Sequence, residues 1–199
     1  MYRKIYLASR SPRRRELLNQ IGAPFDLLLL RENPPRGADV DETPNEGETA
    51  DDYVRRVCSE KANIAWTRML QRSFPKMPVL TADTCVCLGE EILGKPRDND
   101  DAVAMLLRLS GRDHRVLTGV AIIFEDRLEL AISESLVRFE ELSEEAIKAY
   151  VATGEPMGKA GAYAIQGRAA AFAPLLHGSY SGVMGLPLYE TAHLLQRFD

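Results

Sequence analysis

Short runs of apolar residues, separated by polar or turn-forming residues, recur along the chain. The first run, residues 4–8, alternates apolar and polar side chains and is rich in β-prone residues, which predicts a short strand. Comparable runs predict further strands at residues 25–30, 79–88, 91–93, 116–124, 127–139, 162–166 and 170–176.

Apolar residues at helical spacing, bounded by capping residues, predict helices between these strands. In the first helix, Ser11 is a suitable N-cap, Pro12 suits the first helical position and Gly22 ends the segment. A long helix opens at Thr49 with an acidic first turn. Lys61 lies on its apolar stripe, where a lysine either extends its amine to solvent or points it into a cleft. The same criteria predict helices at residues 98–109, 143–152 and 187–198.

This order of strands and helices predicts an α/β fold, with a mixed sheet flanked by helices and two lobes around a cleft. A chain of 199 residues has the length of about one domain, so residues 1–199 are expected to form a single domain. Residues 31–48 are polar and contain several prolines and glycines, which predicts a loop.

Composition and charge exclude several classes of protein. With 45% hydrophobic and 27% charged residues, the chain is neither disordered nor of low complexity. A net charge of −4 argues against a nucleic-acid partner, although a local cationic site remains compatible with it. No apolar stretch is long enough to span a membrane, and the N-terminus lacks the apolar core of a signal peptide. We therefore expect a cytoplasmic protein with no membrane partner, whose cysteines (Cys58, Cys85 and Cys87) are reduced and buried.

A candidate anion site follows the first predicted strand. Ser9 and Ser11 supply hydroxyl groups, Arg13 and Arg14 supply guanidinium groups, and the helix start supplies unpaired N–H groups. Such a combination suits a phosphate, because the N-terminus of a helix also carries a partial positive charge. The alternative is an ordinary capped surface helix with solvated arginines.

A second candidate is Asp83, which interrupts an apolar strand. A carboxylate on a rigid strand facing a cleft suits a metal ligand or a general base; the alternative is a hydrogen-bonded structural residue or a bulge. Lys95 and Arg97 directly follow the next hairpin, so their charge could lie near Asp83, although from the residues alone a solvated loop is the ordinary interpretation. Glu42, paired with Asp41 in the first long loop, would by itself be assigned to the solvated surface.

A third candidate is the segment KAGAYAIQG at residues 159–167, which is rich in small residues. Small residues let a flat ligand approach the backbone, and the amide of Gln166 offers both a donor and an acceptor to the edge of a nucleobase. A tightly packed strand and turn would explain the same composition.

Taken in order, these segments resemble the Maf family of nucleoside triphosphate pyrophosphatases. No single motif is specific, but the ordered set is, and it extends over nearly the whole chain. The matching stretches are LASRSPRR at 7–14, DET at 41–43, EKA at 60–62, ADT at 82–84, GKP at 94–96, LSG at 109–111, YVATGEP at 150–156, KAGAYAIQG at 159–167 and GSYSGVMGLP at 178–187.

The resemblance implies hydrolysis of a nucleoside triphosphate between its α and β phosphates, which yields a monophosphate and pyrophosphate. It also implies a divalent metal cation (Mg²⁺ or Mn²⁺) as cofactor. The implied fold is related to the inosine-triphosphate pyrophosphatases, with an elongated mixed sheet and a cleft. Members are often dimers, so a homodimer is one expectation.

The residues associated with substrate choice resemble the branch of the family that acts on dTTP and UTP. Arg13, Thr84 and Gln166 match that branch, whereas the sister branch, which prefers 7-methyl-GTP, tends to carry Glu at position 166. Two departures are Ala164, where Gly is common, and residues 168–171, where relatives often carry glycines.

Motifs and resemblance together assign a role to each candidate residue. The catalytic candidates are Asp83 as general base, with Lys61 and Lys95 neutralising charge on the phosphates. The metal candidates are Asp83 and Glu42. The substrate-binding candidates are Ser9, Ser11, Arg13 and Arg14 for the phosphates, with Thr84 and Gln166 for the pyrimidine edge.

Three alternatives remain open at this point. One is a pyrophosphatase of 7-methyl-GTP or other modified nucleotides. Another is a nucleotide-binding regulator of cell division with little catalysis, against which a general base and two lysines argue. The last is a general phosphatase, which would release orthophosphate instead of pyrophosphate.

Overall fold

The computed structural model describes residues 2–31 and 38–198, so part of the predicted loop at 31–48 (residues 32–37) lies outside the described residues. The described strands form one mixed sheet in the order β2-β1-β3-β5-β6-β7, with β4 paired to β3. The strands are β1 (Ile5–Leu7), β2 (Phe25–Leu27), β3 (Val79–Leu88), β4 (Glu91–Leu93), β5 (Asp113–Phe124), β6 (Arg127–Arg138) and β7 (Leu175–His177).

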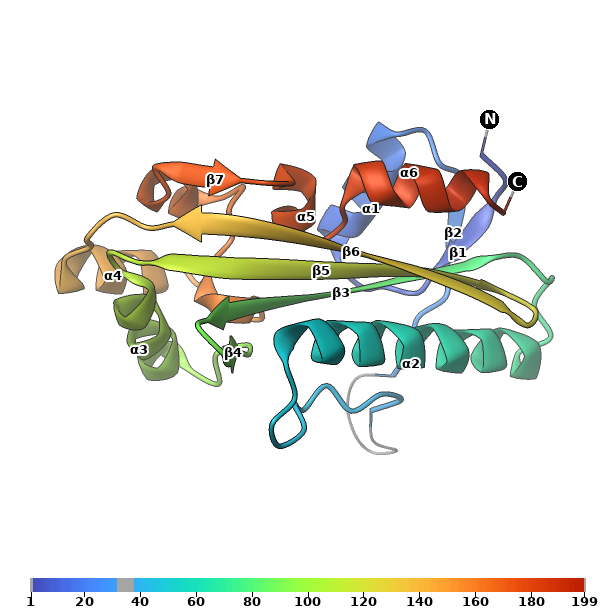
Figure 1. Ribbon diagram of the computed structural model, residues 1–199, viewed down its shortest axis with the longest axis horizontal. Helices are drawn as coiled ribbons and strands as arrows, with labels where there is room; N and C mark the ends of the chain where they lie inside the picture. Colours follow the sequence, from blue (N-terminus) through green and yellow to red (C-terminus); the bar gives the residue numbers. More distant parts are fainter. Residues whose placement is uncertain (1, 32–37, 199) are drawn as a thin grey trace.

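Three long antiparallel strands, β3, β5 and β6, extend along the molecule and give it an elongated shape (Figure 1). The short strand β1 pairs in parallel with both β2 and β3. The carboxyl end of β1 therefore lies beside the middle of the sheet, where Leu7 is in register with Leu80. This pairing brings the segment after β1 close to the candidate Asp83.

Helices cover both faces of this sheet (Figure 1). The long helix α2 packs on one face, and α1 and α6 pack on the other, near the end that carries both termini. Helices α3 and α4 lie at the opposite end. The helices are α1 (Pro12–Gln20), α2 (Ala50–Gln71), α3 (Asn99–Leu109), α4 (Glu144–Val151), α5 (Tyr180–Met184) and α6 (Leu188–Gln196).

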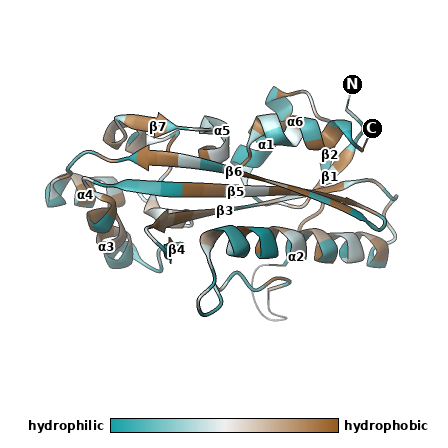
Figure 2. Ribbon diagram, in the orientation of Figure 1, coloured by the Kyte–Doolittle hydropathy of each residue, from teal (hydrophilic) through white to brown (hydrophobic). Residues whose placement is uncertain are grey.

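Burial on both faces explains why the central strands are almost continuously apolar. Along β5, Val120 and Ile122 join the core under α1 and α6, while Ala121 and Ile123 join the core under α2. The apolar colouring in Figure 2 is correspondingly concentrated in the central strands. The predicted mixed sheet flanked by helices is confirmed.

The strands predicted at 162–166 and 170–176 are wrong. The structure has two short 3-10 helices there, η1 (Ala160–Ala162) and η2 (Arg168–Phe172), and only the three residues of β7 form a strand. Gly161 adopts φ +67, and a Cβ at this position would lie 2.9 Å from Val86 Cγ1, so the chain turns tightly against β3. The small residues of this segment correctly indicate close packing, but the packed segment is a turn and not a strand.

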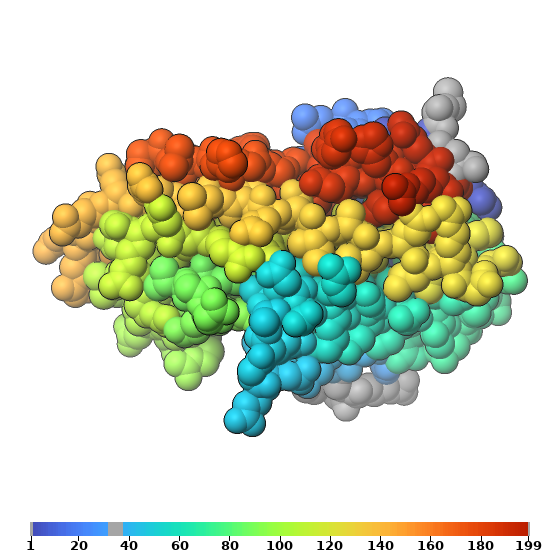
Figure 3. Space-filling view, viewed as in Figure 1, coloured from blue at the N-terminus to red at the C-terminus, as the bar shows by residue number. Residues whose placement is uncertain are grey.

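Three further observations concern the cysteines, the helices and the surface. The thiols of Cys58, Cys85 and Cys87 are free and buried, as predicted. Across the described residues, no helix is long and apolar enough to cross a membrane. The space-filling view shows an indentation in the outline between the segment leading into α2 and the region of α3 (Figure 3).

Candidate active site

A cavity of about 1050 Å³ opens between the two ends of the molecule. It is lined by segments that are distant in sequence: the start of α1, the residues before α2, the middle of β3 and the turn around η1. All ten sequence-predicted site residues line it: Ser9, Ser11, Arg13, Arg14, Glu42, Lys61, Asp83, Thr84, Lys95 and Gln166. Arg97 does not join them, because it forms an exposed ion pair with Asp101.

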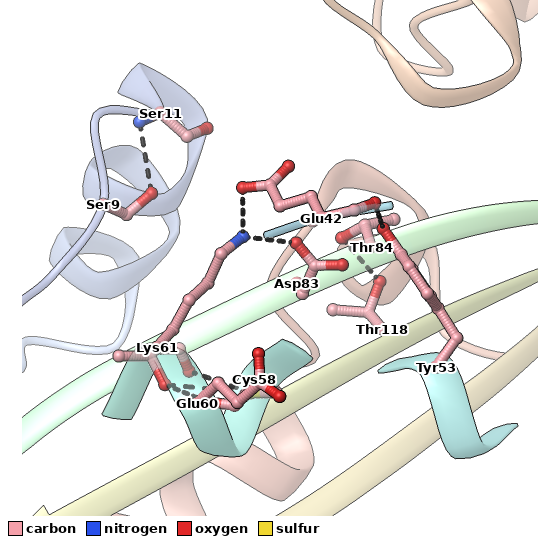
Figure 4. A network of polar contacts seen from close by, with 12 residues as sticks. Ser9, Ser11, Glu42, Tyr53, Cys58, Glu60, Lys61, Asp83, Thr84 and Thr118 are labelled. Carbon is pink, nitrogen blue, oxygen red and sulfur yellow. Dashed lines mark hydrogen bonds and ion pairs between the residues drawn. The ribbon is translucent and has the colours of Figure 1, made fainter. Parts of the chain in front are cut away.

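Lys61 holds two carboxylates of the cavity lining together, as Figure 4 shows for its contacts with Asp83 and Glu42. Its Nζ lies 2.6 Å from Asp83 Oδ1 and 2.8 Å from Glu42 Oε1. The Lys61 side chain is only 12% exposed and that of Asp83 only 9%. Burial alone would lower the pKa of Lys61, but the charges of Asp83 and Glu42 outweigh it and raise that pKa, so the amine stays protonated.

Glu42 is positioned from three sides. Its backbone carbonyl accepts a hydrogen bond of 3.0 Å from the Tyr53 hydroxyl, and its Oε2 lies 3.0 Å from Lys95 Nζ. Burial opposes ionisation of Glu42, but Lys61 and Lys95 overcome this and lower its pKa to about 2. The surface assignment that Glu42 would receive by itself is therefore wrong, because it lies between two lysines of the cavity.

The start of α1 lines the cavity and has no side-chain cap. Helices α2, α3 and α4 each begin with a side chain that accepts a hydrogen bond from their own first turn, whereas α1 has no such cap. Ser11 donates its backbone N–H to Ser9 Oγ at 3.2 Å instead. The first-turn N–H groups are thus available to an anion, which favours the anion site over an ordinary capped helix.

Arg14 connects this helix to the rest of the site. It donates to Gly185 O at 2.7 Å, to Ser9 Oγ at 3.2 Å and to Thr84 Oγ1 at 3.4 Å. Thr84 is in turn 3.0 Å from the Thr118 hydroxyl. Burial lowers the pKa of Arg14, although Asp83 counteracts this. Arg14 therefore acts as a fixed positive charge whose donors join three elements.

Arg13 pairs with Gln166 on the opposite wall of the cavity. With the amide oxygen directed to the guanidinium group, this oxygen accepts from Arg13 Nη1 at 3.0 Å and from Arg13 Nε at 3.1 Å. The oxygen is then occupied, and the NH₂ group of Gln166 is the part left to meet a ligand.

Charge is strongly concentrated in the cavity. Among the described residues, seven Lys and Arg residues line it against three Asp and Glu residues, although the whole chain carries a net charge of −4. Cationic groups in a concave site attract a small polyanion. The average charge of the chain therefore hides a cationic pocket.

The donor set also suits a magnesium-like cation. Asp83 Oδ2 is buried and has no hydrogen-bond partner within the described part of the chain, and Glu42 lies beside the same lysine. No cluster of three or more His, Cys, Asp or Glu residues that could hold a metal occurs among the described residues. Two carboxylates with water and phosphate oxygens are the usual ligands of Mg²⁺ in nucleotide sites, so these residues fit.

Sequence reasoning missed several supporting residues. Tyr53, Thr118 and Gly185 hold Glu42, Thr84 and Arg14, but they carry no signal of their own in a single sequence. Tyr163 is packed edge-on against His114 and Phe139 and is 6% exposed, so it belongs to the core.

Comparison with known proteins gives a consistent result. A family model described as Maf-like protein matches residues 4–198. A dTTP/UTP pyrophosphatase of Nitrosomonas europaea is 54% identical over 192 residues, which cover 96% of this chain and 93% of the relative. The dTTP/UTP pyrophosphatase of Cupriavidus pinatubonensis is 53% identical, and the match covers 99% of this chain and 98% of the relative. That of Aromatoleum aromaticum is 56% identical, and the match covers 98% of this chain and 95% of the relative. Among solved structures, the Ham1 protein of Staphylococcus aureus matches 69% of this chain and 72% of its own at 12% identity with a TM-score of 0.42, a likeness too distant to argue from.

Proposed function

The chain belongs to the Maf family, and on this premise we propose that it is an enzyme that hydrolyses dTTP and UTP between the α and β phosphates. The products are the nucleoside monophosphate and pyrophosphate. One observation carries the proposal: the Asp83–Lys61–Glu42 cluster and the uncapped start of α1 line the same cavity. A carboxylate base and an anion site are the two parts that hydrolysis of a phosphoanhydride needs.

The cations of the cavity bind and orient the triphosphate. The N–H groups of α1 and the hydroxyl of Ser9, which already accepts from Ser11 and Arg14, donate to phosphate oxygens. Lys95, whose side chain is 61% exposed, reaches the phosphates from the cavity rim. Positioning and charge neutralisation of this kind supply most of the catalysis in phosphoryl transfer.

Asp83 serves as the general base. Its Oδ1 is held by Lys61, so Oδ2 is the oxygen that takes the proton of the attacking water. The water oxygen forms the new bond to phosphorus, the bridging P–O bond breaks, and pyrophosphate leaves with the electron pair. Lys61 remains protonated throughout and keeps the two carboxylates in place.

A divalent cation, Mg²⁺ or Mn²⁺, belongs to the proposal, with Asp83 and Glu42 as its protein ligands. When bound, it would polarise the phosphoryl oxygens and stabilise the leaving pyrophosphate. A single domain over residues 1–199, a location in the cytoplasm and a homodimeric assembly complete the proposal.

The preference for dTTP and UTP follows from the Arg13–Gln166 pair. Because the Gln166 oxygen accepts from Arg13, its NH₂ group presents donors to the base. Thymine and uracil carry carbonyl acceptors on both sides of N3, whereas cytosine has an amino donor at one of them. A fixed donor in the site therefore favours dTTP and UTP over CTP.

A nucleotide panel with Mg²⁺, assayed separately for pyrophosphate and orthophosphate, tests the proposal. We expect pyrophosphate release that is fastest with dTTP and UTP. Orthophosphate as the first product would indicate a general phosphatase. Binding of dTTP without turnover would indicate a nucleotide-binding regulator, and faster cleavage of 7-methyl-GTP would indicate the sister specificity.

A further inference from the structure

The turn that carries Gln166 is fastened to two side chains outside the residues already assigned to the site. Tyr150, at the end of α4, accepts a hydrogen bond of 3.2 Å from Ala164 N, at the start of the turn. Glu155 accepts bonds of 3.0 and 3.2 Å from Arg168 N, at the end of the turn. The Tyr150 hydroxyl donates to Glu155 Oε1 at 2.9 Å, so the two anchors form one unit.

Glu155 packs closely against the backbone of the turn at Gly167. A Cβ on Gly167 would lie 2.2 Å from Glu155 Oε1 and 2.6 Å from Oε2. Gly167 has no need of glycine for its backbone conformation, since its φ is −103. A side chain at position 167 would therefore displace the Glu155 carboxylate, which packs directly on the backbone beside Gln166.

This arrangement replaces the strand that the sequence pattern predicts. A backbone amide at Ala164 that would join a neighbouring strand instead bonds to the Tyr150 hydroxyl. The Tyr150 ring is fixed by an edge-on contact with Phe172 of η2, with ring centroids 5.2 Å apart. Both ends of the turn are therefore tied to side chains that are themselves immobilised.

We infer that Tyr150 and Glu155 are positioning residues for base selection: they hold the 164–168 turn so that the Gln166 amide meets Arg13 with its oxygen and the base with its NH₂ group. The inference rests on the proposed function and names the part of the fold that sets its specificity. Neither residue is among those that line the cavity, whereas Asp83, Lys61 and Gln166 are. Loss of either anchor, Tyr150 or Glu155, should therefore change the choice of base more than the rate of the chemical step.

The test compares UTP with CTP in wild type, Tyr150→Phe and Glu155→Ala. Each variant removes anchoring hydrogen bonds, and we expect the UTP-over-CTP ratio of kcat/KM to fall about tenfold. The fall should come from a higher KM for UTP, with kcat within about threefold of wild type. Glu155→Gln keeps an acceptor at the position of Oε1 and should recover most of the ratio.

Two comparisons separate positioning from general destabilisation. Glu144→Ala removes an exposed carboxylate of the same helix α4, and Tyr189→Phe removes an exposed hydroxyl; both should leave the ratio unchanged. Because Tyr150 and Glu155 act as one unit, the double variant should lose no more than the worse single variant. Should Glu155→Ala fail to fold, Tyr150→Phe and Glu155→Gln decide the question.

An unchanged UTP-over-CTP ratio in folded Tyr150→Phe overturns the inference, as does an equal loss of kcat with both nucleotides. Either result leaves the proposed function intact if wild type releases pyrophosphate from UTP. Failure of wild type to do so instead removes the proposed function itself.

Discussion

Lys61 Nζ and Asp83 Oδ1 lie 2.6 Å apart, and this ion pair leaves Asp83 Oδ2 buried with no partner within the described residues. The two oxygens of one carboxylate are thereby distinguished: one is fixed by the lysine, and the other is left without a partner within the described residues. A rigid strand beneath the carboxylate and a long helix beneath the lysine keep this geometry constant.

Replacing Asp83 by Asn tests the assigned base. The amide can still accept from Lys61, but it cannot take a proton from water at the position of Oδ2. We expect kcat for pyrophosphate release from dTTP to fall by about 10²–10⁴-fold, with KM changed only a fewfold. Asp113→Asn, which alters an exposed ion pair with Arg138, is the matched control. Near wild-type turnover in folded Asp83→Asn would exclude Asp83 as the base.

Replacing Lys61 by Met tests the electrostatic role of the lysine. Lys61 is the main charge that lowers the pKa of Glu42 to about 2 against the effect of burial. Without it, burial opposes ionisation of Glu42 with less compensation, so the pKa of Glu42 rises and its ionisation requires a higher pH. We expect the acid limb of the pH profile of kcat/KM to move to higher pH and the maximum to fall. Lys148→Met, at an exposed pair on α4, should leave the profile in place; an unmoved acid limb in Lys61→Met contradicts the assignment.

Part of this site could be predicted from the sequence because individual residues break a local pattern. Asp83 stands out as a carboxylate in an apolar strand, and Lys61 as a lysine on an apolar stripe. Glu42 does not stand out, because an acidic residue in a polar loop is ordinary. Its importance depends on Lys61 and Lys95, which only the tertiary fold brings within 2.8 and 3.0 Å.

The fold is also predictable from the sequence only in part. Long periodic segments such as α2 and β5 were predicted, since burial on one or both faces imposes their pattern. The region 160–172 was not, because its backbone groups bond to side chains such as Tyr150 and Glu155. Hydrophobic periodicity carries no information about such bonds. It therefore cannot distinguish the packed turns at η1 and η2 from strands.

Replacing Gln166 by Glu tests base reading. The variant keeps the length of the side chain and its acceptor toward Arg13, but it loses the NH₂ donors. We expect kcat/KM for dTTP and UTP to fall by tenfold or more, and that for CTP to fall less, because cytosine supplies a donor of its own. Gln196→Glu adds the same charge on the exposed surface of α6 and serves as control. An equal loss with all three nucleotides would argue against a reading role.

Replacing Gly161 by Ala tests the close packing of η1 on β3. An alanine at φ +67 is strained, and its Cβ would also lie 2.9–3.0 Å from the Val86 side chain. We expect a loss of about 2–4 kcal/mol in the free energy of unfolding, measured with urea. Gly22→Ala has the same φ with no atom within 4 Å, so it isolates the backbone contribution. Equal losses in the two variants would show that the contact with Val86 contributes nothing.

His114 provides a test of stability against pH. Burial lowers its pKa from 6.5 to about 4, and its Nε2 lies 2.8 Å from the Tyr163 hydroxyl. The unfolded chain therefore binds a proton at His114 below pH 6.5, whereas the folded chain binds it only near pH 4. Acid thus favours unfolding across this interval, by up to about 3 kcal/mol in total, and the effect is absent above pH 7.

The measurement is the free energy of urea unfolding for wild type and His114→Asn at pH 7 and pH 5. Substitution destabilises the core at both pH values, because His114 packs edge-on against Phe139 and Tyr163. The difference between the two proteins should nevertheless shrink by about 2 kcal/mol at pH 5, because only wild type loses stability through this group. All other ionisable side chains are present in both proteins, so their contributions cancel in this difference. A difference that is the same at pH 7 and pH 5 would mean that the folded protein protonates His114 as readily as the unfolded chain does.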